Sequence, residues 1–219
     1  MRVRLTILVA LAGLAQAQEP PRPAATSLTQ AGSAPQAVDA RGFIHRWFVL
    51  EPVSVPGRLT EAAVEEALKQ SALPDADAAP ADGRKVTIGG SELAWHALDT
   101  RNYNLNLYHF AWSLSKPTSN VVFWVETTID SPREMKDVRL AIGSNAASRW
   151  WLNGAPVIAL NDDRQTVIDD GVSPRVTLKQ GRNVIRAAIV NGGGATDFCA
   201  RLLDANDRPI TGLTTPGKT

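Results

Sequence analysis

Short runs that alternate hydrophobic and polar residues fill most of the chain after residue 42. They are rich in β-branched and aromatic residues and are separated by glycine, asparagine or proline, a pattern typical of strands and turns. The expected strands are residues 43–50, 85–88, 91–97, 107–114, 121–129, 138–142, 149–152, 156–160, 175–178, 184–190 and 198–203. Roughly ten short strands at this spacing predict an all-β sandwich, formed as one domain by residues 42–212.

Two glycine-containing pairs mark the sharpest turns between these strands. Gly89-Gly90 and Asn153-Gly154 each separate two strands by two residues, and a type I′ hairpin turn requires positive φ at both central positions. Alternation along the strands predicts which residues face the core. The residues expected to be mostly buried are Leu140, Ile142, Leu152, Val176, Leu178, Ile185 and Ile189.

One helix is predicted, over residues 60–71. Thr60 can cap its first turn, and Leu59 can pack against Val64 one turn further on. The helix is short, and a long loop follows it over residues 72–84. We therefore expect it to lie at the periphery of the sandwich.

The first residues have the features of a signal peptide. Arg2 and Arg4 precede an apolar run over residues 5–14, and residues 15–17 read Ala-Gln-Ala, a signal-peptidase site. The apolar run is too short to span a bilayer of about 30 Å. We expect residues 1–17 to be removed on export to the periplasm or the medium, leaving no transmembrane segment.

Proline, alanine and glutamine dominate residues 18–41. Such a composition is typical of a flexible tether. We expect the ordered domain to start at residue 42 and to end at residue 212, with residues 213–219 as a tail.

Composition and charge narrow the function classes. Hydrophobic residues make up 44% of the chain against 21% charged, which is sufficient for a buried core. The formal net charge is +1, so a nucleic-acid partner is not expected. Cys199 is the only cysteine, which excludes an intramolecular disulfide and a cysteine-rich metal site.

Three consecutive segments resemble a known family. Residues 140–154 read LAIGSNAASRWWLNG, residues 176–183 read VTLKQGRN, and residues 189–194 read IVNGGG. Together they resemble the galactose-binding-like jelly-roll domain of secreted bacterial proteins, which is similar to carbohydrate-binding modules. The resemblance implies a jelly-roll β-sandwich. Where the family has an acidic pair after the serine, this chain has Asn145 and Ala146, so a ligand site in this loop is lost or altered.

The two adjacent tryptophans are expected to face opposite sides of their strand. If Leu152 lies in the core, Trp150 joins it, while Trp151 and Arg149 share the other face. Trp151 is then the candidate for stacking on a sugar, with Arg149 and Asn145 as polar contacts. The alternative is that both tryptophans pack inside the sandwich.

Four aspartates could form a calcium site after the Asn-Gly hairpin. Asp162, Asp163, Asp169 and Asp170 would supply the oxygen ligands that calcium prefers. Their spacing does not match an EF-hand loop, so a solvated acidic loop is the alternative. No other cofactor is expected.

We find no catalytic motif in the sequence. The chain has no nucleophile elbow, phosphate-binding loop or dinucleotide fingerprint, and Glu126 is the most suggestive single acid. We therefore expect a non-catalytic binding module that contacts carbohydrate. The alternatives are a structural or assembly protein that docks on a cell-envelope partner and, less favoured, a jelly-roll enzyme using Glu126 with a histidine.

Overall fold

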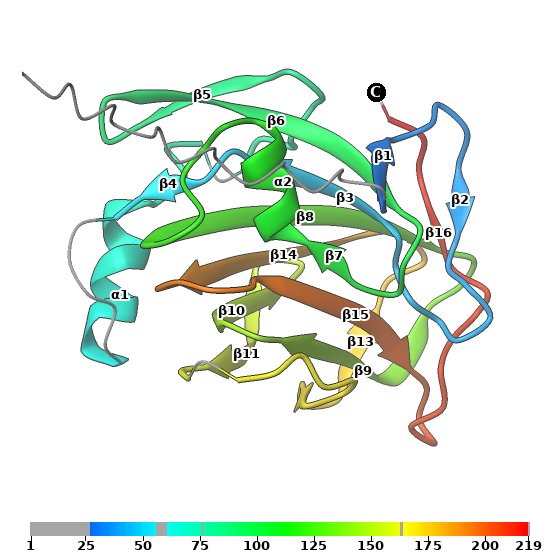
Figure 1. Cartoon of the computed structure of the whole chain (residues 1–219). Coiled ribbons are helices and arrows are strands. Elements are labelled where there is room, and N and C mark those ends of the chain that lie inside the picture. The colour runs from blue at the N-terminus through cyan, green and yellow to red at the C-terminus, as the bar shows by residue number, and fades with distance from the viewer. Residues whose placement is uncertain (1–26, 56–60, 76, 163, 219) are drawn as a thin grey trace, which may run out of the picture.

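Two antiparallel sheets pack face to face in the computed structural model, which describes residues 27–55, 61–75, 77–162 and 164–218 (Figure 1). The larger sheet consists of β1 (Leu28–Gln30), β2 (Gln36–Ala37), β3 (Arg46–Leu50), β4 (Val53–Ser54), β5 (Lys85–Ile88), β6 (Ser91–Thr100), β8 (Val121–Ser131), β10 (Ala147–Leu152), β11 (Ala155–Leu160), β14 (Gly181–Asn191) and β16 (Thr214–Thr215). The smaller sheet consists of β7 (Leu105–Asn106), β9 (Met135–Ser144), β12 (Gly171–Val172), β13 (Val176–Leu178) and β15 (Asp197–Leu203). The predicted all-β sandwich is confirmed.

The centre of the larger sheet has the order β3-β8-β14-β10-β11. β8 and β14 pair along their whole length, and β10 pairs with β14 on one side and with β11 on the other. The β10–β11 hairpin turns at Asn153 (φ 51°) and Gly154 (φ 83°), so the predicted type I′ conformation is confirmed. β8, β14 and β10 form the floor of the site described below.

The core between the sheets is built around three aromatic rings. Trp47, Trp150 and Phe198 meet edge to face, with ring centroids 4.9–6.2 Å apart. Of the residues expected in the core, all are buried except Val176, which is half-buried. The alternation of hydrophobic and polar residues along the strands therefore predicted the buried residues correctly.

A second apolar layer covers the outer face of the larger sheet. The helix α1 (Glu61–Gln70) confirms the predicted helix, although the expected cap at residue 60 and staple at residue 59 lie outside the described residues. Val64 and Ala67 are buried one turn apart on α1 and pack in a cluster that includes Trp124 of β8. The helix thus lies over the sheet and forms one wall of a cavity.

The prediction of a strand over residues 107–114 is wrong, because these residues form the helix α2 (Leu107–Ser113). The buried residues Leu107, Phe110 and Ala111 follow helical spacing, a signal that the aromatic composition of the segment obscured. Asn106 caps the helix by accepting a hydrogen bond from the His109 N–H at 2.8 Å. No helix in the described part of the chain is long and apolar enough to cross a membrane.

Replacing Asn106 by alanine is expected to destabilise the protein by about 1 kcal/mol, the typical cost of losing a helix N-cap. The Asn106 side chain is the acceptor for the His109 N–H, and alanine leaves that donor without its partner. Urea unfolding of the parent and the variant measures the difference. An unchanged midpoint would show that the cap does not contribute to stability.

The expected tether and tail both belong, in part, to the sandwich. β1 pairs with β6, and β2 pairs with β16, so short strands from both segments extend the larger sheet. The buried Arg46 fastens both segments by donating to the backbone oxygens of Ala34 (2.6 Å) and Pro216 (2.9 Å). Pairing through backbone groups needs no apolar side chains, so composition gave no sign of it. Residues 1–26, with the expected signal peptide, lie outside the described residues.

Candidate functional site

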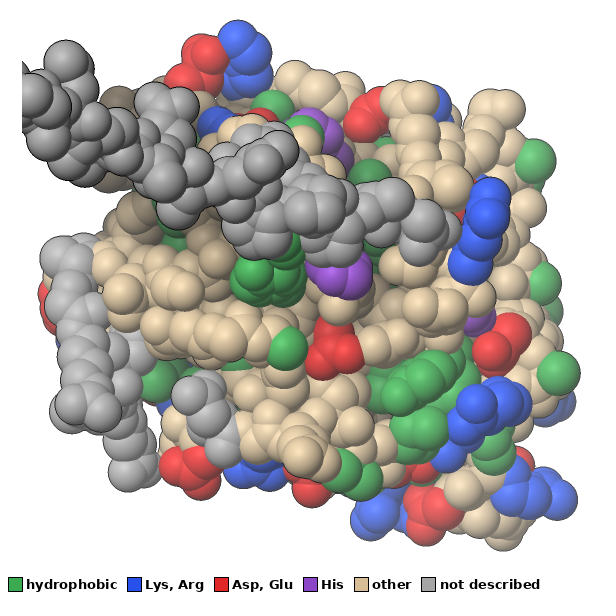
Figure 2. Space-filling view, viewed as in Figure 1, with side chains coloured by type: hydrophobic (Ala, Val, Ile, Leu, Met, Phe, Trp, Pro, Cys, Tyr) green, Lys and Arg blue, Asp and Glu red, His purple; other side chains and the backbone are tan. Residues whose placement is uncertain are grey.

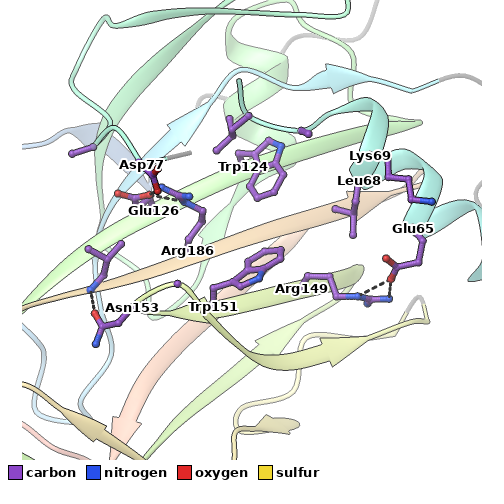
Figure 3. A pocket seen from close by; sticks show the side chains of 15 residues that line it. Glu65, Leu68, Lys69, Asp77, Trp124, Glu126, Arg149, Trp151, Asn153 and Arg186 are labelled. Carbon is purple, nitrogen blue, oxygen red and sulfur yellow. Dashed lines mark hydrogen bonds and ion pairs between the residues drawn. The ribbon is translucent and has the colours of Figure 1, made fainter. Parts of the chain in front are cut away.

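A cavity of about 820 Å³ lies between α1, the loop that follows it and the outer face of the larger sheet (Figure 3). Its floor comes from β8, β14 and β10, and one wall comes from α1 and from Ala72, Leu73, Asp77 and Ala79 of the loop after it. The lining residues are Glu65, Leu68, Lys69, Ala72, Leu73, Asp77, Ala79, Trp124, Glu126, Arg149, Trp151, Asn153, Gly154, Val184 and Arg186. This volume is in the range of pockets that hold a small organic ligand.

Two stacked tryptophans form the aromatic part of the cavity. The Trp124 and Trp151 rings lie 5.8 Å apart at an interplanar angle of 28°. Trp124 Nε1 donates to the Ser71 carbonyl oxygen at 2.8 Å, which fixes the end of α1 over the sheet. Trp151 is half-buried, whereas its neighbour Trp150 is fully buried in the core. The predicted opposite orientation of the two tryptophans is confirmed.

Arg149 lines the cavity beside Trp151, as strand alternation predicts, but its hydrogen bonds go to the protein (Figure 3). Nε and Nη2 donate to Glu65 Oε1 on α1 at 3.1 and 2.5 Å. Nη2 also donates to Asn161, and Nη1 donates to the carbonyl oxygens of Ser148 and Leu160. All five guanidinium N–H groups therefore have acceptors. Arg149 positions α1 against the β10–β11 hairpin rather than offering donors to a ligand.

Glu126 and Arg186 form an ion pair in the floor of the cavity. They are opposite each other in the pairing of β8 with β14, and Arg186 Nε and Nη2 lie 2.7 and 2.6 Å from Glu126 Oε2. The Glu126 side chain is only 4% exposed. Burial raises the pKa of this carboxyl group, and the neighbouring Arg186 opposes that rise. The sequence pointed to Glu126 but not to Arg186, because the register of the two strands is not visible in it.

The Glu126 carboxyl group is expected to titrate above the ordinary pKa of a glutamate. The folded protein then keeps this proton at pH values where the unfolded chain has lost it, so this group's contribution to stability falls as the pH rises through that interval. Carboxyl-carbon NMR titration measures the pKa, and urea unfolding at several pH values measures the stability. A midpoint at or below that of an ordinary glutamate would contradict the expectation.

Asn145, the third predicted sugar contact, does not line the cavity. It lies in the turn between β9 and β10, where Nδ2 donates to the Ala195 carbonyl oxygen at 2.6 Å and Oδ1 accepts from the Asp197 N–H at 3.0 Å. The structure therefore brings together Arg149 and Trp151 but separates Asn145 from them. In this chain the loop is held by hydrogen bonds to Ala195 and to Asp197 at the start of β15.

The predicted calcium ligands are paired with two arginines. Arg201 Nε donates to Asp169 Oδ1 at 2.9 Å, and Arg164 Nη1 donates to Asp170 Oδ2 at 2.7 Å. Asp162 lies 3.7 Å from Arg164, and residue 163 is outside the described residues. Among the residues that the structure describes, no three His, Cys, Asp or Glu side chains are grouped to hold a metal ion. The three described aspartates are thus each paired with an arginine, and the calcium site stays a prediction.

No family model matches the sequence, and no curated protein matches it either. Similar solved structures include a β-glucosidase from Kluyveromyces marxianus, at 17% identity over 72% of this chain and 16% of that chain, with a TM-score of 0.42. The PA14 domain of the antifreeze protein MpAFP is 14% identical over 78% of this chain and 92% of that one, with a TM-score of 0.46. The PA14 sugar-binding domain of an RTX adhesin is 11% identical over 80% of this chain and 99% of that one, with a TM-score of 0.45.

Proposed function

We propose that the protein is an exported, non-catalytic carbohydrate-binding module and that its sugar lies in the cavity beneath α1. The half-buried Trp151 ring inside a cavity with charged side chains carries this proposal. A sugar ring has an apolar C–H face and an edge of hydroxyl groups. An aromatic ring packs against the first, and Glu126 and Arg186 offer hydrogen bonds to the second. Export rests on the signal peptide expected at residues 1–17.

The ion pairs made by the carboxylates in the cavity favour a binding role over a catalytic one. Hydrolysis of a glycosidic bond requires two carboxyl groups, one acting as an acid and the other as a base or nucleophile. Of the three acidic side chains that line the cavity, Glu126 is bound by Arg186 and Glu65 by Arg149. Only Asp77 then lacks an arginine partner among the described residues. These pairings support a structural and recognition role for Glu126.

A glycan array followed by calorimetry tests the proposal. Trp151→Ala is expected to weaken binding of the array's best ligand by roughly 10- to 100-fold, as for removal of a stacked aromatic anchor. Trp112→Ala is the matched control, because Trp112 is a half-buried tryptophan on α2 that does not line the cavity. This variant should bind as the parent does.

Two results would contradict the proposal. If Trp151→Ala binds the sugar as tightly as Trp112→Ala does, the ligand lies elsewhere on the molecule. If the parent binds no glycan on the array, the sugar-binding function is wrong, and docking on a cell-envelope protein becomes the better hypothesis.

A further inference from the structure

The floor of the cavity contains hydrogen-bonding groups that have no partner among the described residues. Arg186 contacts Glu126 through Nε and Nη2, and within the described part of the chain its Nη1 has no acceptor. Both contacts fall on Glu126 Oε2, so Oε1 likewise accepts no hydrogen bond from a described residue. Since Arg149 has used all of its donors, Arg186 and Glu126 remain as the polar pair in this floor that is available to a ligand.

A donor beside an acceptor, both without a partner among the described residues, suits a hydroxyl-bearing ligand. Each hydroxyl group can accept one hydrogen bond and donate another, so neighbouring hydroxyls on a ring can accept from Arg186 and donate to Glu126. The pair lies on the same outer sheet face as the two tryptophans (Figure 3). A ring packed on Trp151 would therefore have its hydroxyl edge within the same cavity as this pair.

The charges around the cavity cancel. Its acidic residues are Glu65, Asp77 and Glu126, and its basic residues are Lys69, Arg149 and Arg186. In Figure 3, Lys69 and Glu65 extend from α1, whereas Glu126 and Arg186 come from the floor strands β8 and β14. An anionic group brought to Arg186 would lose its hydration and meet Glu126, whose charge already balances the arginine. The floor therefore offers an anion no net attraction.

The exposed surface is similarly mixed. On the face drawn in Figure 2, basic and acidic side chains are interspersed among the described residues, consistent with the formal net charge of +1. The surface therefore provides no long-range electrostatic attraction that would offset the unfavourable contact of an acidic sugar with the floor of the cavity.

We infer that the cavity selects an uncharged sugar ring with adjacent hydroxyl groups, which hydrogen-bond to Arg186 and Glu126, and that it rejects sugars carrying a carboxylate. This inference rests on the proposed sugar-binding function and names the ligand class of the same site. It assigns Arg186 and Glu126 as the residues that determine specificity, while Arg149 positions α1.

Paired sugars test the inference directly. Calorimetric titration compares the methyl glycosides of glucose, galactose and mannose with the corresponding methyl uronides, which differ by a carboxylate at C6. The parent is expected to bind at least one neutral glycoside 10-fold or more tightly than its uronide. Binding of the neutral glycoside should change less than twofold between 50 and 500 mM NaCl, because no net charge is involved.

Glu126→Gln tests the role of the ion pair in that preference. The amide keeps the shape of the side chain but leaves the charge of Arg186 unbalanced, so the neutral-to-uronide affinity ratio should fall at least 10-fold. Glu134→Gln is the matched control, because Glu134 pairs with Lys136 on the surface and does not line the cavity. The double variant Glu126→Gln with Arg186→Gln should lose neutral binding without gaining uronide binding.

Circular dichroism melting of each variant shows whether a loss of binding comes from a loss of fold. If Glu126→Gln unfolds because the charge of Arg186 is left unpaired, the double variant, which has neither charge, takes its place. A parent that binds uronides more tightly than neutral sugars, or an unchanged ratio in folded Glu126→Gln, would overturn the inference and leave sugar binding intact. Absence of any carbohydrate binding by the parent would instead refute the proposed function.

Discussion

Replacing Trp150 by alanine is expected to lower the free energy of unfolding by about 3–5 kcal/mol, the range for deleting a large buried aromatic side chain. The Trp150 ring has no exposed surface and packs edge to face with Trp47 and Phe198 at centroid distances of 6.2 and 5.6 Å. Its Nε1 donates to Ser148 Oγ at 3.0 Å inside the core. The variant would lose these contacts and leave a cavity between the two sheets.

Urea unfolding of Trp150→Ala, Trp151→Ala and Trp112→Ala measures this effect. Trp151 and Trp112 are half-buried, so we expect both of their variants to lose much less stability than Trp150→Ala does. If Trp151→Ala is the most destabilised of the three variants, the assignment of Trp150 to the core and of Trp151 to the outer face is wrong.

Replacing Asn183 by alanine is expected to cost about 2–4 kcal/mol, because one fully buried side chain satisfies several polar groups at once. Asn183 Nδ2 donates to the carbonyl oxygens of Lys179 and Gly181 at 2.8 and 3.0 Å. Its Oδ1 accepts from the Lys179 N–H and from Asn153 Nδ2, both at 3.0 Å. Asn183 therefore joins the turn before β14 to the β10–β11 hairpin.

Asn183→Asp gives a matched comparison in the same unfolding experiment. Aspartate keeps an acceptor for Lys179 and Asn153 but loses the two donated bonds. We expect its free energy of unfolding to be reduced as well, since the two carbonyl oxygens then face a carboxylate. An alanine variant as stable as the parent would show that the hydrogen-bond network does not contribute.

Local sequence patterns were sufficient for most of the strands and for the faces of β10. The alternation of Trp150 and Trp151 predicted one buried ring and one ring on the outer face, because successive side chains in a strand point in opposite directions. The Asn153-Gly154 pair predicted its hairpin because few residues tolerate positive φ at both positions. These features depend on neighbouring residues alone.

The sequence was misleading where composition and spacing disagreed. Residues 107–113 contain the aromatic residues typical of strands, yet Leu107, Phe110 and Ala111 follow the helical period, and α2 forms. β1 and β2 were missed because polar edge strands are held by backbone hydrogen bonds, which any composition can make.

By itself, the sequence determined the all-β class, the main strands, α1 and the side of the sheet to which Trp151 belongs. Only the tertiary structure decided that a cavity exists and which side chains meet in it. Glu126 and Arg186 are 60 residues apart in the chain, and Arg149 and Glu65 are 84 apart. The register of β8 with β14 joins the first pair, and the packing of α1 on the outer sheet face joins the second. Both arrangements arise from contacts between distant segments, which no local pattern of residues specifies.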